Sequence, residues 1–491
     1  MKKYILGRFI RSIFSILAVV CIAIILVYTL IPRDEIFKVD PNFTKLQGDS
    51  RTTYMYARWK ELGYLDYQQQ ADMCKAYSDD YSSCMASEGD FEEVVKAYEN
   101  DGYTIQTLKS GLVFAYRNYS IPELVGRFFS NLIVIDNPSA VQDSDNPDLE
   151  RSYYIESGPN GIPALKCSGC QYQYQLYVNG SFPFIHQNVI KLNFGISFPT
   201  HSGVNTLEVI NRGQDKTKSE EITFPNGSTG NSPINLYTCQ YKATSTLDHL
   251  DESHFDDNYA NCAYNYTAPS MTTLSYMFGI LSLIIAYAIA LPAGVMMARK
   301  KDKWQDKLGM VYINFMIAVP SLAFIYFAKQ IGLMFGLPDK FPQYGFSDIR
   351  SYILPVIILA LMSTASVMIW IRRYMIDQSN ADYVKFARAK GLNEKEIFNK
   401  HILKNAIIPI VNGIPSSIIL CISGSVITES VFAIPGMGKM LPDSINAYNN
   451  NMVITLTFIF TALSIFSLLL GDILMTIVDP RIQLSSKGDS R

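Results

Sequence analysis

Charged residues are scarce in this sequence. Of its 491 residues, 18% are charged and 48% are apolar, whereas about 25% of the residues in ordinary soluble domains are charged. The formal net charge is −2, so the chain lacks the basic excess that is typical of proteins that bind nucleic acid. A single soluble domain does not fit this composition, and neither does a nucleic-acid-binding protein.

Motifs for catalysis and metal binding are also missing. Gly438-Lys439 looks like the end of a P-loop, but Met440 replaces the required Ser or Thr, and Ala433 occupies the position of the first Gly. The sequence contains no HExxH motif and no nucleophile elbow. We therefore expect no catalytic residue, no metal site and no cofactor in this chain.

Six long apolar runs dominate the rest of the chain. Each reaches the roughly 20 residues that an α-helix needs to cross a bilayer, and helices satisfy the backbone polar groups inside lipid. The first run ends at Leu30-Ile31-Pro32-Arg33, which lacks a small-x-small cleavage site, so we favour a retained helix over a cleaved signal peptide. The six predicted spans are 12–32, about 274–298, 308–328, 351–371, 405–428 and 444–471.

Basic residues predict how these spans are oriented. The N-terminus, loop 299–307, loop 372–404 and the tail after 478 carry 20 Lys and Arg residues, whereas loops 329–350 and 429–443 carry four. Because short cytoplasmic loops are enriched in Lys and Arg, we expect both termini in the cytoplasm. The chain is therefore predicted to have three parts. Residues 1–32 contain the first helix, residues 33–270 form an extracellular domain, and residues 271–491 contain helices two to six.

The predicted outer block is acidic and polar. Residues 33–270 carry 18 basic and 31 acidic residues, a balance of −13. Spaced apolar residues at about 62–100 indicate helix, and the alternation at 172–178 indicates a strand. We therefore expect an α+β domain. The acidic, His-containing run 248–257 is expected to be a solvated linker rather than a cation site.

Six cysteines lie in the outer block. An even number on an oxidising face predicts up to three disulfides, although sequence alone leaves their connectivity open. The local pairs 74–84 and 167–170 are the simplest pairing. Cys167-x-x-Cys170 could instead be redox-active or half a zinc site, but no second CxxC accompanies it. The candidate disulfide cysteines are Cys74, Cys84, Cys167, Cys170, Cys239 and Cys262.

Loop 372–404 is the most informative segment of the chain. A good helix-forming stretch from Asp382 stops at Gly391, a residue suited to the left-handed conformation after a helix. Asn393, with Glu396 three residues later, resembles a capping box that opens a second helix. We therefore predict a helix-turn-helix whose corner carries the small residues Ala387 and Ala389 and the charged residues Arg388 and Lys390.

The residue order of this loop resembles a known pattern. Tyr383-Val384-x-x-Ala-Arg-Ala-Lys-Gly-Leu, followed by Lys400-His401-x-x-Lys404-Asn405-Ala406-x-x-Pro409, resembles the coupling loop of ABC importer permeases of the oligopeptide/dipeptide/nickel branch. Lys385-Phe386-Ala387 replaces the general Glu-Ala-Ala, and Leu403-Lys404 replaces Leu-Pro. Similar likeness is found at 1–8, 369–374 and 428–438, and at Asp472 with 479–482. The resemblance covers roughly 1–32 and 270–485, and is strongest to B-type oligopeptide permeases in the Ami-like form of Gram-positive bacteria.

This resemblance implies a type I ABC importer permease fold of six transmembrane helices, with the α+β domain inserted between helices 1 and 2. It implies a permease subunit of an ATP-driven oligopeptide importer, not an enzyme, in the bacterial cell membrane. The expected partners are a second, C-type permease, two ATPase subunits that bind ATP and Mg, an extracellular lipid-anchored peptide-binding protein and the peptide itself. The residues expected to contact the ATPase are Ala387, Arg388, Ala389, Lys390, Gly391 and Leu392.

The translocation path and the function leave alternatives open. Asn314 and Asn412 are polar residues inside apolar spans and are the candidate path residues. Pro320 is one of several prolines that can kink these helices. The alternative functions are a dipeptide or nickel permease or, in another class, an autonomous channel or a ligand-sensing receptor. A receptor would need a cytoplasmic output domain, for which loop 372–404 leaves no room.

Overall fold

The computed structural model describes residues 2–478 except 79, 142–150, 159–160, 179–183, 215–216, 224–228, 234–239, 243–257, 262–264 and 267. It divides into two compact units. We call Met1–Ile31 with Ser270–Arg491 the membrane unit, and Pro32–Pro269 the outer unit. These borders lie within one residue of the predicted ones. Cys239, Cys262, the acidic run 248–257 and the C-terminal 479–482 lie outside the described residues.

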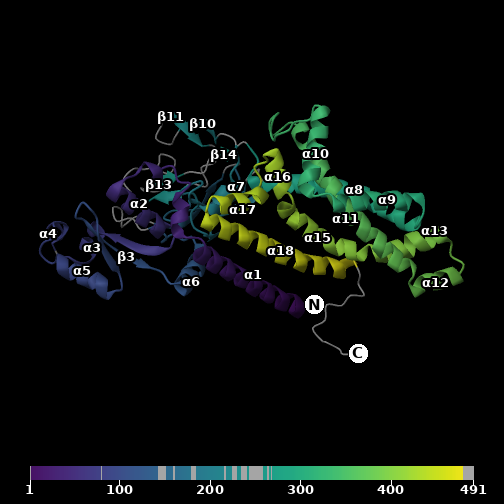
Figure 1. Cartoon of the computed structure of the whole chain (residues 1–491). Helices are drawn as coiled ribbons and strands as arrows, with labels where there is room; N and C mark the ends of the chain where they lie inside the picture. The colour runs from purple at the N-terminus through teal and green to yellow at the C-terminus, as the bar shows by residue number, and fades with distance from the viewer. Residues whose placement is uncertain are drawn as a thin grey trace. The chain divides into compact units, whose positions relative to one another are not determined.

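The membrane unit is helical throughout its described part (Figure 1). Five of its helices are long and apolar enough to cross a membrane without interruption, and a bent helix pair makes six if it counts as one span. A helix-turn-helix follows α11, and a six-residue π-helix leads from it towards α15. The helices are α1 (Lys2–Leu30), α8 (Met271–Arg299), α9 (Trp304–Ala318), α10 (Ser321–Met334), α11 (Arg350–Ser379), α12 (Asp382–Ala389), α13 (Glu394–Glu396), the π-helix (Ile397–Ile402), α14 (Leu403–Ala406), α15 (Ile408–Gly424), α16 (Val426–Phe432), α17 (Met437–Asn446) and α18 (Asn450–Val478).

The third predicted span is not one straight helix. The chain bends by 110° between α9 and α10. Val319 is extended, with φ −78° and ψ 128°, because a residue that precedes proline is displaced from the helical region. Pro320 then starts α10 without a backbone donor. The prediction of a continuous helix over 308–328 is therefore wrong at this proline.

Small residues allow the membrane helices to approach closely. Helix α8 packs along α11, and α18 packs against both α1 and α15 (Figure 1). A Cβ placed at Gly294 of α8 would lie 2.8 Å from Ile371 Cγ2 of α11. A Cβ at Gly471 of α18 would lie 2.8 Å from the backbone oxygen of Asn412 in α15. Such contacts are the usual way in which helices associate within lipid.

Two ion pairs link helix ends that adjoin the predicted basic segments of the membrane unit. Arg8 at the start of α1 forms an ion pair with Asp472 near the end of α18. Arg372 at the end of α11 donates to both carboxylate oxygens of Asp306 near the start of α9, at 2.6 and 2.7 Å. At the other end, Phe341 N–H donates to Phe432 O at 2.8 Å, joining the two loops that are poor in basic residues. The start of α1 and the end of α18 therefore lie next to each other, which agrees with the charge pattern.

The outer unit combines short helices with small antiparallel sheets. The strands pair in the orders β1-β3-β2, β5-β6-β7-β8, β4-β9, β11-β10-β14 and β12-β13. The strand expected at 172–178 is β7, and the region expected to be helical, 62–100, also contains strand β1. The elements are the 3₁₀ turns Arg33–Phe37 and Phe43–Lys45, helices α2 (Gly48–Glu61), α3 (Gln70–Tyr77), α4 (Tyr81–Met85), α5 (Phe91–Asn100), α6 (Ile121–Leu132) and α7 (Thr206–Asn211), and strands β1 (Leu65–Gln69), β2 (Thr104–Thr107), β3 (Val113–Asn118), β4 (Ile133–Ile135), β5 (Tyr153–Ser157), β6 (Pro163–Cys167), β7 (Tyr174–Val178), β8 (Ile185–Gln187), β9 (Ile190–Leu192), β10 (Thr217–Thr223), β11 (Thr229–Pro233), β12 (Gln240–Lys242), β13 (Asn258–Asn261) and β14 (Asn265–Tyr266).

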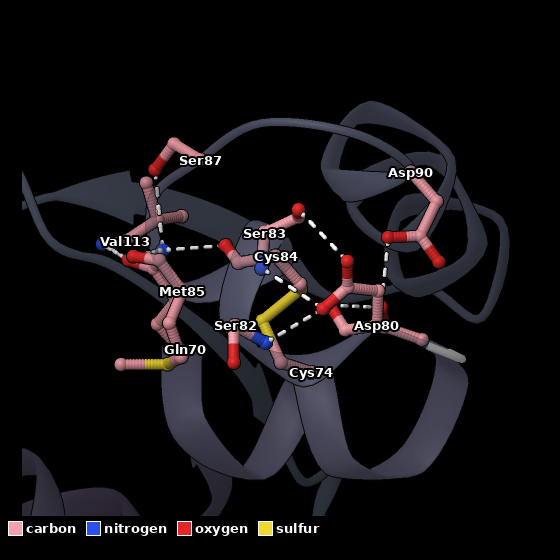
Figure 2. Close-up of a disulfide and its surroundings, with 11 residues drawn as sticks. Gln70, Cys74, Asp80, Ser82, Ser83, Cys84, Met85, Ser87, Asp90 and Val113 are labelled. Carbon is pink, nitrogen blue, oxygen red and sulfur yellow. Dashed lines mark hydrogen bonds between the residues drawn. A yellow bond between two sulfur atoms is a disulfide. The ribbon is translucent and has the colours of Figure 1, made fainter.

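Disulfides join the two local cysteine pairs suggested by the sequence. Cys74 is bonded to Cys84, and Cys167 to Cys170. Figure 2 shows the first disulfide between α3 and α4, beside the buried side chain of Gln70. The Gln70 amide donates to the carbonyls of Cys84 and Met85 and accepts from Val113 N–H at 2.9 Å. A disulfide of this kind contributes roughly 2–4 kcal/mol, so it braces a small core formed by α3, α4, α5 and the first sheet.

Candidate coupling site

The corner of loop 372–404 is built by a helix end that requires glycine. Helix α12 ends at Ala389, and Gly391 then takes φ +79°. Gly391 N–H donates to Arg388 O, and Leu392 N–H donates to Ala387 O. These two bonds form a Schellman motif, in which the residue after the cap adopts the left-handed conformation. The predicted helix stop at Gly391 therefore has its expected geometry.

The second arm of the corner starts at Asn393. Its side chain accepts from Glu396 N–H at 2.8 Å, which caps α13. Glu396 does not complete the predicted capping box, because its carboxylate instead accepts from Lys400 at 2.7 Å. Arg388 spans the corner and donates to both carboxylate oxygens of Glu394, at 2.7 and 3.2 Å. These hydrogen bonds lower the pKa of Glu394.

The inner face of the corner is attached to the membrane helices. Val384 of α12 and Ile397 of the π-helix are fully buried. They belong to one cluster with Met297 of α8, Ile313 of α9 and Met375 of α11. Burial of a single large aliphatic side chain stabilises packing by about 1.5–3 kcal/mol, whereas an exposed ion pair such as Arg388–Glu394 is screened by solvent and contributes little. The apolar cluster therefore holds the corner to three membrane helices.

The outer face of the corner carries four of the six predicted residues. Arg388, Ala389, Lys390 and Gly391 are exposed. Ala387 is 6% exposed and belongs to the inner cluster, and Leu392 packs against that cluster. Ala387 therefore faces the membrane helices of this chain, and the contact with the ATPase expected for it stays a prediction. Val384 and Ala387 are three residues apart, so they share the helix face that is turned inward.

Phe386 is the surface feature that the sequence analysis missed. Its side chain is 70% exposed, although it lies on a short helix whose apolar face is already buried. The signal was available in the sequence, because Phe386 falls outside the inward face defined by Val384 and Ala387. An exposed aromatic ring between Lys385 and Arg388 is suited to contact with another protein.

A buried carboxylate organises the outer turn between α15 and α18. Glu429 is 0% exposed and accepts from Ser275 Oγ of α8 at 2.7 Å and from Ser425 Oγ at 2.5 Å. Its second oxygen accepts from Lys439 N–H in the first turn of α17 at 2.8 Å. Glu429 thus caps the N-terminus of α17 and ties it to α8 and α16, because the first amides of a helix lack partners within the helix.

The two candidate path residues lie on different helices. Asn314 is exposed on α9. Asn412 is half-buried on α15, and its side-chain oxygen lies 3.1 Å from where a Cβ of Gly471 in α18 would be. That oxygen is covered and lacks a hydrogen-bond partner within the described residues. Asn412 is therefore placed at a contact between two helices, and Asn314 on an open surface.

Comparison with known proteins shows the family. Residues 290–484 match the family described as the inner membrane component of binding-protein-dependent transport systems. The oligopeptide transport system permease protein AmiC of Streptococcus pneumoniae is 45% identical over 99% of this chain and 100% of its own length. The chain belongs to the oligopeptide permeases of ABC importers.

More distant permeases match less than half of this chain. The dipeptide transport system permease protein DppB of Lactococcus lactis is 33% identical over 43% of this chain and 69% of its own length. One chain in a solved structure of the MetNI methionine ABC transporter is 15% identical, with 42% of this chain and 93% of that chain covered. Its TM-score of 0.35 is too low to support an argument about the fold.

As an oligopeptide permease, the chain is a multi-pass membrane protein and one component of a multi-subunit importer. The matched residues 290–484 contain both the corner at Gly391 and the outer turn at Glu429. They do not include the outer unit. Membership of this family favours a transport subunit over the receptor and the autonomous channel considered above.

Proposed function

We propose that this permease forms half of the translocation path of an ATP-driven oligopeptide importer and that loop 372–404 couples it to an ATPase subunit. The corner of that loop carries the proposal. Its inner face is packed against α8, α9 and α11, while Phe386 and Arg388 remain exposed. A force applied to the outer face would therefore move three membrane helices together.

The second half of the path would come from a C-type permease. In the most apolar stretch of Ile408–Phe432, 7% of the residues are buried within this chain, compared with 50% in Arg350–Ser379. Because so few residues of this span are buried by its own chain, we expect a helix of the partner permease to pack against it. Two ATPase subunits, which would bind ATP and Mg, and an extracellular lipid-anchored peptide-binding protein would complete the importer.

Transport would follow from alternating access. Closure of the ATPase subunits on nucleotide would displace the corner, and the attached helices would open the path to the opposite side. No group in this chain needs to react. Oligopeptides are the proposed cargo because AmiC is named as part of an oligopeptide system, and a dipeptide or nickel cargo is the alternative.

We expect the whole importer to copurify through this loop. With the permeases and ATPases coexpressed, detergent extracts of the wild type should yield the ATPase subunits together with this chain. Phe386→Asp should reduce the recovered ATPase at least tenfold, because the exposed ring would become a charge. Thr107→Asp, at an exposed site of the outer unit, is the matched control. Equal recovery of ATPase from both variants would contradict the coupling proposal.

Both termini are proposed to lie in the cytoplasm of a bacterial cell, with the outer unit outside. Fusion reporters placed after Lys300 and at the C-terminus should therefore report the cytoplasm, and a reporter at Glu150 the outside. The reason is the concentration of basic residues at one end of the membrane unit. A cytoplasmic signal at Glu150 would overturn this topology.

A further inference from the structure

The four-stranded sheet β5-β6-β7-β8 of the outer unit exposes its aliphatic side chains, which a sheet would normally bury. Across β5, β6 and β7, Ile155 pairs with Leu165, and Leu165 with Leu176, so these three side chains share one face. Ile185 of β8 lies on the same face, because it is two residues from Gln187, the partner of Leu176. Ile155, Leu176 and Ile185 are 75%, 46% and 65% exposed. We call them the aliphatic face.

The opposite face of this sheet is polar and yet buried. Lys166 is 6% exposed and forms an ion pair with Glu156 at 2.6 Å. Gln175 is 0% exposed and donates to the buried carboxylate of Asp136 at 2.8 Å. Tyr177, 4% exposed, stacks on His186 with ring centroids 5.1 Å apart.

These polar contacts fix which face is outside. A slip of one residue would turn every side chain of a strand to the other face. Here it would bring Leu176 inward at the cost of the Gln175–Asp136 hydrogen bond and leave a buried acceptor with fewer donors. Loss of a partner by a buried polar group costs about 1–3 kcal/mol. The fold thus holds the aliphatic face outward, which indicates that the face has a binding role.

We propose that the aliphatic face is the docking surface of the permease for the extracellular peptide-binding protein of the importer. This inference rests on the proposed function. The family is described as one in which transport depends on a binding protein, and the sheet belongs to the unit that the topology places outside. The surface is a row of side chains that extends from β5 to β8, about 14 Å wide at 4.8 Å per strand.

Charge and area favour this occupant over two others. The outer block has a balance of −13, so an anionic lipid surface or a second copy of this unit would be repelled. The aliphatic face offers on the order of a few hundred Å², below the roughly 1,200–2,000 Å² of a stable interface. Such an area suits a partner that binds, delivers its cargo and leaves.

The test measures binding of the peptide-loaded binding protein to the purified importer complex, for example by biolayer interferometry in nanodiscs. The double variant Ile155→Thr/Ile185→Thr keeps β-branched residues in both strands and removes apolar surface. We expect its Kd to rise at least tenfold. Leu112→Thr makes the same kind of change at another exposed aliphatic residue of the outer unit and should leave Kd unchanged, as should Ile155→Val.

Two further measurements separate docking from folding and from coupling. Basal ATPase activity and protease resistance of the double variant should equal those of the wild type, and peptide uptake should recover at saturating binding protein. An unchanged Kd would overturn the proposal. It would also be overturned if the double variant lost only self-association, or lost only binding to vesicles rich in anionic lipid. If the wild-type complex bound the binding protein but took up no peptide, the proposed function would fail while docking stood.

Discussion

Gly391→Val is expected to abolish peptide uptake while the protein still inserts in the membrane. Gly391 has φ +79°, and a β-branched residue is forced out of that conformation. The left-handed conformation costs an L-residue roughly 1–2 kcal/mol, enough to lower the ratio of intact to disrupted corners by a factor of about 5–30. The Schellman bonds at Ala387 and Arg388 would be lost with it, so Phe386 and Arg388 would no longer share one surface with Lys390.

Asparagine at the same position is the matched control. A Cβ at Gly391 would meet no atom within 4 Å, so side-chain volume is not the obstacle. Asn tolerates the left-handed conformation better than other L-residues, and Gly391→Asn should retain most of the uptake. The measurement is import of a labelled peptide, normalised to the amount of permease in the membrane. Uptake by Gly391→Val at the wild-type rate would show that the corner geometry does not matter.

The sequence predicts the coupling corner well because local rules determine it. Gly391 and Asn393 mark the helix end and the next helix start through their own backbone and side-chain chemistry, without help from distant residues. The roles of Ala387 and Phe386 depend instead on which face of α12 packs against α8, α9 and α11. That choice is tertiary, and the small residues at the corner do not reveal it.

The outer unit and the bent span were less predictable for the same reason. Alternation at 172–178 gives strand β7 but cannot say which face is buried, and here the polar face of Gln175 and Tyr177 is inside. Pro320 is one of several prolines within apolar runs, and Pro292 and Pro355 lie inside continuous helices. Glu429 was not singled out because a single carboxylate at the end of an apolar run resembles a span boundary. Its donor Ser275 is 154 residues away in the sequence, and the donor from Lys439 is a backbone N–H, which the residue type does not reveal.

Glu429→Leu is expected to destabilise the membrane unit strongly. Ser275 Oγ, Ser425 Oγ and Lys439 N–H would lose their acceptor. Each buried donor without a partner costs about 1–3 kcal/mol, within a total stability that is about 5–15 kcal/mol for an ordinary protein. We expect little folded permease after detergent extraction, a lower unfolding temperature for what remains, and no uptake. Thermal unfolding followed by size-exclusion chromatography measures this.

Two companion variants show whether the carboxylate itself is responsible. A Cβ at Gly436 would overlap the Glu429 carboxylate, so Gly436→Ala should lower the unfolding temperature while Glu429 remains in place. Lys439→Ala keeps the backbone N–H that donates to Glu429 and removes only a half-buried side chain, whose contact with Asp443 at 3.7 Å contributes about 0.3–0.5 kcal/mol. It should therefore behave like the wild type. If Glu429→Leu and Lys439→Ala unfolded at the same temperature, Glu429 would not hold α17 to α8, and the outer turn would be stabilised by its apolar contacts alone.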